Sequence, residues 1–424
     1  MIRPYFCRNG DVLKKILYVL TLSVLCYGCN TGSSEKVKQQ PEDSLQYYPP
    51  TPGRLSQQDF RRYLRELTAY FDKHLPAGSF NGGILVAKEG HVLFEKYTGF
   101  ANLRTKDTLT DSTSFHIASV SKTFTAIAVL RLAQEQKLSL SDSVQRFFPG
   151  LPYPGVTVKT LLNHRSGIPN YIYFMDDSKE DREKNVTNAD VLQQLYTEKP
   201  ARNFKAGTRF SYSNTNFVLL ALIVEKLSGL PFPQYMQQTF FGPLQMRHTY
   251  VYTPADSARV ISSFTAGGTV WDNDHLENTY GDKNIYSTPS DLLKWDQALY
   301  TDQLVGRPLL DSAFTPYSLE RPSVHNYGLG FRLLLLPNGK KVIYHFGRWH
   351  GFNAVFARLT AEKATIIILG NRYNRGIYLS ARKAYEIFSD YGKGSSEDEE
   401  EADTQQNAAP KKAARSKSSK KRSR

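Results

Sequence analysis

Three short motifs in this chain contain residue types that can carry out acyl transfer. In the first, Ser-Val-Ser-Lys, Ser119 and Lys122 stand three residues apart at the start of an apolar run. A serine hydroxyl is a poor nucleophile until a base takes its proton, and residues three apart on a helix share a face. The spacing therefore predicts a serine nucleophile with a lysine beside it. The N–H groups at the start of such a helix would favour negative charge on an attacked carbonyl oxygen.

The local setting separates this motif from chance copies. Ser-x-x-Lys begins at four serines, Ser33, Ser119, Ser380 and Ser418, and the first and last of these stand in polar, low-complexity ends. Only the copy at Ser119 opens a long amphipathic helix, because apolar residues follow it at spacings near three and four. An isolated copy would be interpreted as a helix N-cap followed by a solvated lysine.

The other two motifs are Tyr-Ser-Asn, with Tyr212 and Asn214, and His-Phe-Gly, which ends at Gly347. A lysine ammonium cannot accept a proton, so Lys122 must be neutral or must work with a neutral partner. Tyr212 is the candidate for that partner. Considered alone, Tyr212 and Asn214 are equally typical of a turn and cap before an apolar helix at 217–227. The order of the three motifs along the chain favours a shared catalytic site.

With these motifs, the chain resembles the serine β-lactamase and penicillin-binding protein superfamily, in its class C β-lactamase-like branch of carboxypeptidases, aminopeptidases and esterases. The resemblance also rests on residues 161–169, 286–288 and 351–352, and it spans about residues 58–391. Carried over to the matching positions, it implies that Ser119 is the nucleophile and that Lys122 helps to deprotonate it. Tyr212 would relay the proton and Asn214 would position the substrate.

The third motif departs from the family at one position. His345 occupies the place of the lysine in the family's Lys-Thr-Gly motif, so the resemblance places His345 and Gly347 among the substrate-binding residues. The backbone N–H of Arg348, just after Gly347, would be the second oxyanion donor. Phe346 stands where the family has a hydroxyl that helps to hold a free carboxylate, and a phenyl ring has no hydrogen-bonding group. We therefore expect a poor β-lactamase that prefers an ester or amide without that carboxylate. The alternatives are that Phe346 points into the core, because side chains alternate along a strand, or that Arg348 supplies the anion contact.

Other chemistries find no support in the motifs. The sequence has no Gly-x-Ser-x-Gly elbow, no His-Glu-x-x-His helix and no glycine-rich phosphate loop, and we expect neither a metal nor another cofactor. His164 precedes a Ser-Gly turn and is interpreted as a hydrogen-bonded structural residue rather than a base.

Residues 1–28 are typical of a signal peptide, because two lysines precede an apolar run at 16–27 that is short for a membrane span. A small residue followed by Cys29 resembles a bacterial lipoprotein box, so Cys29 is the expected lipidated first residue, anchored in the membrane. Cys26 stands where leucine is usual, and a plain signal peptide or signal anchor is the alternative. Asn30 favours the outer membrane, and the chain is expected to be an exported bacterial lipoprotein.

The remaining end segments are polar. Residues 29–57 suit a proline-containing tether, and residues 394–424 form an acidic block and then a basic tail that cannot bury a core. The net charge of +14 divides into +3 for residues 1–28, +3 for 393–424 and +8 for the body between them. Such a surplus is a mild bias toward anionic envelope surfaces, and no specific nucleic-acid binding is expected.

Residues 58–393 are expected to form the catalytic domain, with an α/β (α+β) fold of the β-lactamase/transpeptidase type. This means an antiparallel sheet built from both chain ends, flanking helices and a mainly helical subdomain. The charged segment 171–190 could be a lid or a surface loop. The expected elements are helices at 58–74, 217–227 and 377–391, a hairpin at 83–97, and strands at 327–336, 341–346, 352–359 and 364–369.

The function predicted from these residues is that of a secreted serine hydrolase acting through an acyl-enzyme on a small-molecule, peptide or cell-wall-related ester or amide. A carboxypeptidase or β-lactamase is the second possibility, for which Phe346 is the adverse feature. A catalytically silent envelope sensor on the same fold is the third. The unusual stretch Gly-Asp-Lys-Asn at 281–284 keeps the third possibility open.

Overall fold

The structure of the chain is a computed structural model that describes residues 49–176 and 185–392. The predicted signal peptide, Cys29, most of the tether and the charged tail lie outside these residues, as does part of the segment 171–190. All described residues belong to one compact unit.

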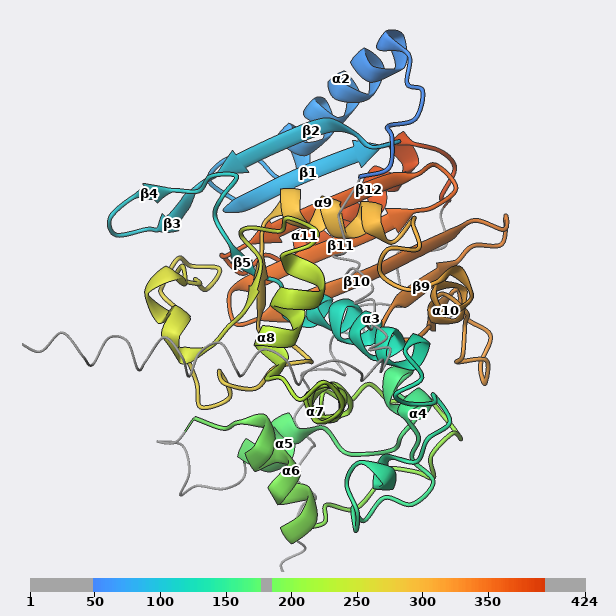
Figure 1. Cartoon of the computed structure of the whole chain (residues 1–424). Helices are drawn as coiled ribbons and strands as arrows, with labels where there is room; N and C mark the ends of the chain where they lie inside the picture. The colour runs from blue at the N-terminus through green and yellow to red at the C-terminus, as the bar shows by residue number, and fades with distance from the viewer. Residues whose placement is uncertain (1–48, 177–184, 393–424) are drawn as a thin grey trace, which may run out of the picture. The chain divides into compact units, whose positions relative to one another are not determined.

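A seven-stranded antiparallel sheet forms the centre of this unit (Figure 1). Its order is β2-β1-β12-β11-β10-β9-β8, so the first two strands lie beside the last one, and Gly82 pairs with Gly370. The predicted sheet assembled from both chain ends is thereby confirmed. Its strands are β1 (Gly82–Lys88), β2 (His91–Thr98), β8 (His325–Tyr327), β9 (Arg332–Leu335), β10 (Lys341–Trp349), β11 (Phe352–Leu359) and β12 (Ala364–Gly370).

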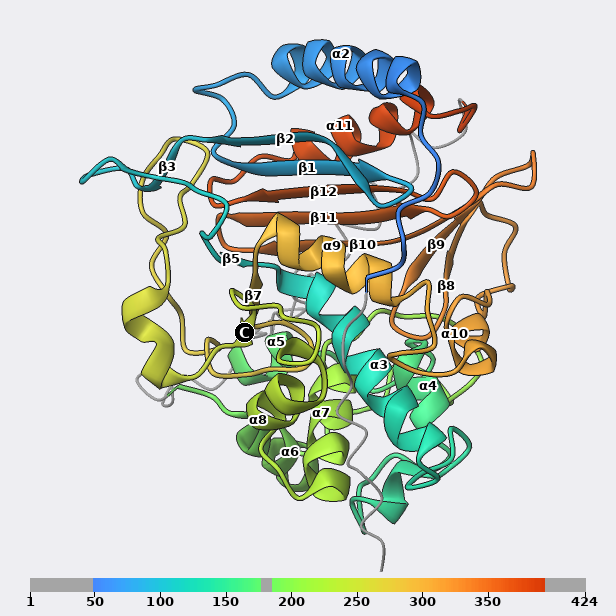
Figure 2. The ribbon, with the colours of Figure 1, turned by 45° about the horizontal axis from the view of Figure 1, so that its top comes forward.

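Helices cover both faces of the sheet. Figure 2 shows α2 (Gln57–His74) and α11 (Gly376–Ala384) on one face, with α9 (Pro289–Ala298) and α3 (Ser121–Gln134) on the other. Side chains of β1 alternate between two cores, because successive residues of a strand point to opposite faces. Ile84 and Val86 pack in the core shared with α2 and α11, whereas Leu85 and Ala87 pack in the larger core shared with α3 and α9.

The helical region is built around α7 (Thr215–Ser228), which is apolar on most sides and is buried along most of its length. It ends where Gly229 takes up a left-handed conformation with φ 73°. The other helices are α4 (Val158–Leu162), α5 (Tyr171–Asp176), α6 (Asn188–Thr197), α8 (Phe232–Met236) and α10 (Arg307–Ala313). Short helical turns are η1 (Ala118–Val120), η2 (Val144–Arg146), η3 (Gln237–Phe241), η4 (Pro254–Arg259) and η5 (Tyr385–Ile387).

The described residues also form two smaller sheets. Strands β5 (Phe115–His116), β7 (Ile285–Ser287) and β6 (Tyr250–Val251) form a three-stranded sheet in the order β5-β7-β6. Strands β3 (Phe100–Asn102) and β4 (Asp107–Thr108) form a hairpin. Because β5 runs directly into η1 and α3, the three-stranded sheet sets the position of the segment that carries Ser119.

The structure differs from the sequence expectations in three places. The single strand expected at 327–336 is instead the end of β8 at Tyr327, a turn at 328–331 and the short strand β9. The chain turns there because Gly330 has φ 81°, and a Cβ on it would lie 2.3 Å from the Cβ of Ala126. The last helix ends at Ala384 and continues only as η5, short of the expected residue 391. The described parts of the segment 171–190 are α5 at its start, residues 185–187 without regular structure, and the beginning of α6.

Within residues 49–176 and 185–392, no single helix is both long and apolar enough to cross a membrane. One bent pair, Thr215–Ser228 with Phe232–Phe241, meets the requirement by length and composition only, with a bend of 76°.

Candidate active site

Ser119 stands on a short turn rather than on the first residue of the α-helix. The turn is η1, which lies between β5 and α3. Ala118 has φ 47°, and its N–H donates to Nδ1 of His116 at 3.1 Å. A positive φ is uncommon for a residue with a Cβ and persists only where the surroundings enforce it. His116 and β5 therefore hold the turn that presents Ser119.

Lys122 lies beside Ser119 and makes three polar contacts. Its Nζ is 3.1 Å from Ser119 Oγ, and it donates to Asn214 Oδ1 at 2.7 Å and to the backbone oxygen of Asp282 at 2.8 Å. A neutral amine has two N–H groups and one lone pair. If the two N–H groups bind the Asn214 and Asp282 oxygens, the lone pair is left for the Ser119 hydroxyl. The geometry therefore suits a lysine that accepts a proton from serine.

Burial lowers the pKa of Lys122 from its ordinary 10.5 to about 7. The nearby positive charges of Lys283 and Arg332 act in the same direction, and the Asp282 carboxylate acts against them. With a pKa at that level, about half of the molecules carry a neutral amine at pH 7. A base whose pKa lies near the working pH is the most effective one for proton transfer.

Tyr212 packs among rings and cations at the pocket wall. Lys122 Nζ lies 4.9 Å from the centroid of its ring and the guanidinium carbon of Arg332 lies 5.5 Å from it. The face of a tyrosine ring attracts a cation such as the Arg332 guanidinium. The ring of His164 lies 4.2 Å away, and His164 Nδ1 accepts the N–H of Ser213 at 3.2 Å. His164 thus packs behind the Tyr-Ser-Asn motif as a hydrogen-bonded residue.

Strand β10 passes so close to η1 that position 347 has no room for a side chain. A Cβ on Gly347 would lie 2.3 Å from the backbone oxygen of Ile117 and 3.0 Å from the backbone nitrogen of Ser119. The hydroxyl of Tyr378, on α11, donates to the Gly347 oxygen at 2.8 Å and holds the strand from the other face of the sheet. The close packing of β10 on η1 places Arg348, the residue after Gly347, in the same pocket as Ser119.

His345 lies behind the pocket and not in its wall. The side chain is fully buried; Nε2 accepts the Tyr327 hydroxyl at 3.1 Å and Nδ1 donates to the Phe346 oxygen at 2.7 Å. Burial, with the charges of Arg332 and Lys122, holds the pKa of His345 well below its ordinary range, so the imidazole is neutral. The expectation that His345 contacts substrate is therefore revised: in this arrangement it orients β10 and Tyr327.

Phe346 points toward α11, as alternation along the strand predicts. Its ring packs 4.9 Å from that of Tyr344 and 5.1 Å from that of Tyr378, measured between centroids. It is 8% exposed and also contributes to the pocket lining. Phe346 is thus mostly a core residue, and it adds no hydrogen-bonding group to the pocket.

The stretch 281–284 supplies parts of the site that the sequence analysis did not assign. Gly281 turns the chain with φ 95°, and the next residue offers its backbone oxygen to Lys122. The Asp282 carboxylate accepts the Tyr171 hydroxyl at 3.1 Å, and Lys283 Nζ donates to the same hydroxyl at 2.8 Å. The only sequence signal was a polar tetrapeptide just before an apolar strand. These buried charges set the electrostatic environment of Lys122.

His116 is a second residue that the sequence analysis missed. Its Nδ1 accepts the Ala118 N–H, so the other nitrogen is the donor, to Asn284 Oδ1 at 2.8 Å. Burial lowers the pKa of His116 to about 4, which keeps this neutral tautomer in place. A single buried imidazole thereby joins η1 to the stretch 281–284.

The catalytic pocket, as we call the hollow beside Ser119, has a volume of ≈ 50 Å³. Tyr212, Asn214, Gly347 and Arg348 line it together with Ser119. Lys122 lies beneath Ser119 and is fully buried. Of the residues predicted for the site within the described part of the chain, only the His345 side chain is set away from the reacting centre.

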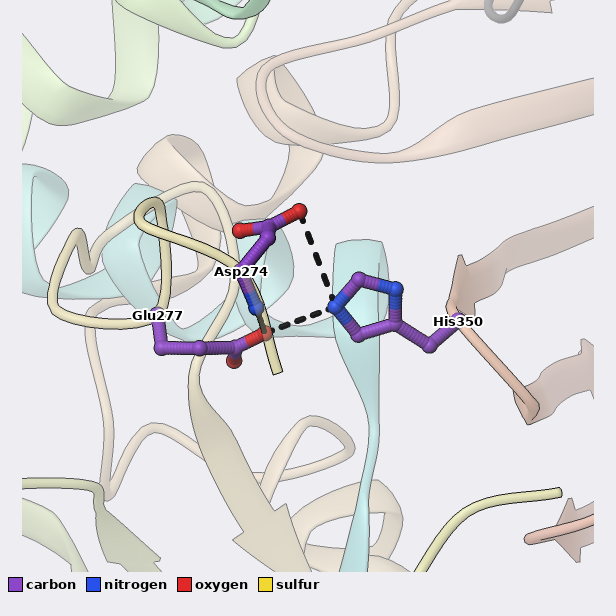
Figure 3. Close-up of side chains that lie close together, drawn as sticks. All are labelled: Asp274, Glu277 and His350. Carbon is purple, nitrogen blue, oxygen red and sulfur yellow. Dashed lines mark hydrogen bonds and ion pairs between the residues drawn. The ribbon is translucent and has the colours of Figure 1, made fainter. Parts of the chain in front are cut away.

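One group of side chains has the composition of a metal site. Asp274, Glu277 and His350 bring their ligand atoms within 4.8 Å of one another (Figure 3). His350 Nε2 is 2.7 Å from Glu277 Oε1 and 3.7 Å from Asp274 Oδ2. Ligands around a tetrahedral zinc ion stand about 3.3 Å apart. The shorter separation is that of a hydrogen-bonded pair, and Trp349 Nε1 also donates to Glu277 at 3.1 Å.

Comparison with known proteins identifies the family. Residues 60–385 match the family model described as Beta-lactamase. This chain belongs to the beta-lactamase family. Penicillin-binding protein 4* of Bacillus subtilis (strain 168) is 34% identical to this family member over 333 residues, which are 74% of this chain and 72% of that protein. Putative penicillin-binding protein PbpX of the same strain is 26% identical over 353 residues, 81% of each chain.

Solved structures show the same beta-lactamase fold. The penicillin binding protein from Bacillus halodurans matches with a TM-score of 0.66 and 24% identity, over 76% of this chain and 99% of that one. The D-amino acid amidase from Ochrobactrum anthropi SV3 matches with a TM-score of 0.64 and 21% identity, over 77% of this chain and 98% of that one. The predicted superfamily and fold are confirmed, and the chain is a member of a family of serine hydrolases.

Proposed function

We propose that this chain is a serine hydrolase that works through an acyl-enzyme on Ser119. The observation that carries the proposal is the contact of a fully buried Lys122 amine, with its pKa lowered to about 7, with the Ser119 hydroxyl at 3.1 Å. In the proposed reaction, neutral Lys122 takes the Ser119 proton as Oγ attacks the substrate carbonyl. Tyr212 passes a proton to the leaving group, and water then releases the acyl group by the reverse sequence.

The charge that develops on the carbonyl oxygen would be held by two backbone N–H groups, those of Ser119 and Arg348. The lack of space at Gly347 supports this assignment, because only a glycine lets β10 approach the Ser119 nitrogen so closely. Asn214 would act mainly by fixing the Lys122 amine, since its Oδ1 accepts from that group. His345 would act through β10 and not through the substrate.

We propose an ester or amide of the cell envelope as the substrate, of the kind cleaved by esterases and peptidases. Phe346 brings no hydroxyl to the catalytic pocket, which favours substrates without a carboxylate at that point. The proposed setting is the outer membrane, with the chain exported and anchored through a lipid on Cys29. Processing at Cys29 would be tested by metabolic labelling with a fatty acid, compared with Cys29→Ala.

A carboxypeptidase or β-lactamase is the second candidate, and Arg348 favours it. Arg348 lines the catalytic pocket, and its guanidinium could hold a carboxylate in place of the missing hydroxyl. Penicillin-binding protein 4* bears a name that points in the same direction.

One experiment tests both candidates. Intact-protein mass is followed over time after mixing the leaderless body with an activated short-chain ester or with a penicillin. We expect an ester adduct that forms and clears, is absent from Ser119→Ala, and is unchanged in Ser112→Ala, an exposed serine outside the pocket. A lasting penicillin adduct instead would favour the second candidate. No adduct with either compound would contradict the acyl-enzyme proposal.

A further inference from the structure

A second cavity lies next to the catalytic pocket, and Trp349 lines both. We call it the side cavity. Its volume is ≈ 340 Å³, compared with ≈ 50 Å³ for the catalytic pocket. Ligand sites in proteins commonly have volumes of about 300–1,000 Å³, whereas a cavity that holds one water needs about 10–15 Å³. The catalytic pocket therefore has room for little more than the reacting group, and the side cavity is a neighbouring space large enough for a further part of a substrate.

The charge of the side cavity is opposite to that of the chain. The body carries a surplus of positive charge, yet no Lys or Arg stands among the described residues that line the side cavity. Its lining includes Asp272 and Glu277, with His350 as the one group that can carry a positive charge. The catalytic pocket, by contrast, is lined by Lys283 and Arg348 along with Asp282. The side cavity is therefore the more acidic of the two hollows.

The two carboxylates of the side cavity differ in how they are paired. Glu277 is paired on both sides: Trp349 Nε1 donates to it at 3.1 Å, and His350 Nε2 lies 2.7 Å from its Oε1. Figure 3 shows the contact with His350. Burial would raise the pKa of Glu277, but the hydrogen bond with His350 helps to lower it to about 2. Asp274 stands 3.7 Å from the same imidazole. Asp272 is exposed, and within the described residues it makes no ion pair. Of the two carboxylates that line the side cavity, Asp272 is thus the one that an incoming cation can reach.

Aromatic rings make up much of the remaining surface. Five line the side cavity, those of Tyr252, Trp271, Tyr286, Trp349 and Phe352. Trp271 is 39% exposed and Val270 is 54% exposed, so apolar surface is open to solvent at the side cavity. Ring faces with a carboxylate nearby are the usual surroundings of a bound ammonium group.

From these features we propose that the side cavity binds the ammonium-bearing end of the acyl part of the substrate. The proposal rests on the proposed hydrolase function and names the substrate class: esters or amides whose acyl chain ends in a cation. In a peptide, the free ammonium lies on the acyl side of the scissile bond and the carboxylate on the leaving side. The acidic side cavity matches the ammonium on the acyl side, and the proposal needs no carboxylate on the leaving side.

The spacing of residues along β10 indicates how long the acyl chain must be to reach the side cavity. From Gly347, beside Ser119, to Trp349, at the side cavity, the path is two residues of β10. At about 3.3 Å per residue this is about 7 Å, the reach of two extended amino-acid residues or a six-carbon chain. A cation placed one carbon from the carbonyl would not reach the side cavity.

The test compares isosteric esters that differ only in charge. One carries a 6-(trimethylammonio)hexanoyl group, and the other carries 7,7-dimethyloctanoyl, in which a tert-butyl group replaces the cation. We expect kcat/KM to be about tenfold higher for the cationic ester, and the Asp272→Asn variant to lose most of that ratio through KM. Asp302→Asn, at an exposed aspartate that lines neither hollow, should keep the wild-type ratio. Equal rates for the two esters in the wild type, or a ratio unchanged in Asp272→Asn, would overturn the proposal.

A binding measurement keeps this result separate from the hydrolase proposal. Two of the three tryptophans, Trp271 and Trp349, line the side cavity, and the third, Trp295, is fully buried. Tryptophan fluorescence of Ser119→Ala should change saturably with 6-(trimethylammonio)hexanamide and much less with its tert-butyl isostere. Equal responses to the two amides would overturn the side-cavity proposal. A preference for the cation without any ester adduct on Ser119 would uphold it while contradicting the acyl-enzyme.

Discussion

Replacing Gly347 by alanine is the sharpest test of the site's geometry. The change adds one methyl group, at a position where the backbone is extended and glycine's conformational freedom is not needed. Its whole effect should therefore come from the contact between β10 and η1. The new Cβ would lie 2.3 Å from the Ile117 oxygen and 3.0 Å from the Ser119 nitrogen.

The size of the effect follows from these distances. Ordinary van der Waals contacts of a Cβ begin at 3.4 Å, so β10 and η1 must separate by about 1 Å. A displacement of about 1 Å at a catalytic centre can cost about 10²-fold in rate, and losing one oxyanion donor costs about 10²–10³-fold. Because the two proposed donors, on Ser119 and Arg348, stand on the separated segments, we expect Gly347→Ala to lower kcat by about 10²–10³-fold.

The assay is steady-state hydrolysis of an activated ester, with thermal unfolding to establish that each variant is folded. The matched control is Gly267→Ala, because its Cβ would meet nothing nearer than Thr265 Oγ1 at 3.8 Å, and we expect wild-type kcat for it. A folded Gly347→Ala variant with kcat within about threefold of wild type would refute the reasoning that β10 and η1 form the oxyanion site together.

Three further predictions concern protonation, the hydroxyl of the pocket and a buried ion pair. The neutral form of Lys122 is the proposed base, and burial lowers the pKa of this amine to about 7. The kcat/KM should therefore rise with pH through about 7 and then become constant. A rise near pH 10.5 instead would remove Lys122 from the role of base. Tyr212→Phe keeps the ring and should lower kcat by about 10²-fold or more with little change in Tm, and near-wild-type turnover would contradict a proton relay through Tyr212. Arg358→Met should lower the free energy of unfolding by about 3–5 kcal/mol, because Arg358 Nε donates to Asp296 Oδ1 at 2.5 Å and the carboxylate would be left buried without its partner. Urea unfolding measures that loss, and a change below about 1 kcal/mol would show that the pair is not needed.

Much of the sheet could be predicted because its signals are local. The β1–β2 hairpin follows from two apolar runs around Glu89-Gly90, and β10, β11 and β12 each fall within a residue or a few of the expected ranges. The division of β8 from β9 could not be predicted, because Gly330 turns the chain there to pack against Ala126 on α3. That contact depends on tertiary structure and leaves no periodic pattern.

The same distinction between local signals and tertiary contacts applies to the active site. Ser119, Lys122 and Tyr212 stand in motifs, and the sequence therefore predicted that they lie together. Asp282 reaches Lys122 across 160 positions of the chain through a backbone oxygen, which no residue type can signal. His116 looks like any strand histidine until its two nitrogens are seen to join separate segments.

The pairing of β1 with β12 also has a consequence for how the chain becomes active. Residues that register against each other in these strands, such as Gly82 and Gly370, are far apart in sequence, and such non-local contacts form slowly because a long loop must close first. During synthesis the segment with Ser119 leaves the ribosome well before β10 with Gly347 does. The nucleophile therefore exists for a time without its opposite wall. We expect activity to appear only after the last strands have docked, so that the order of synthesis itself delays hydrolysis until folding is nearly complete.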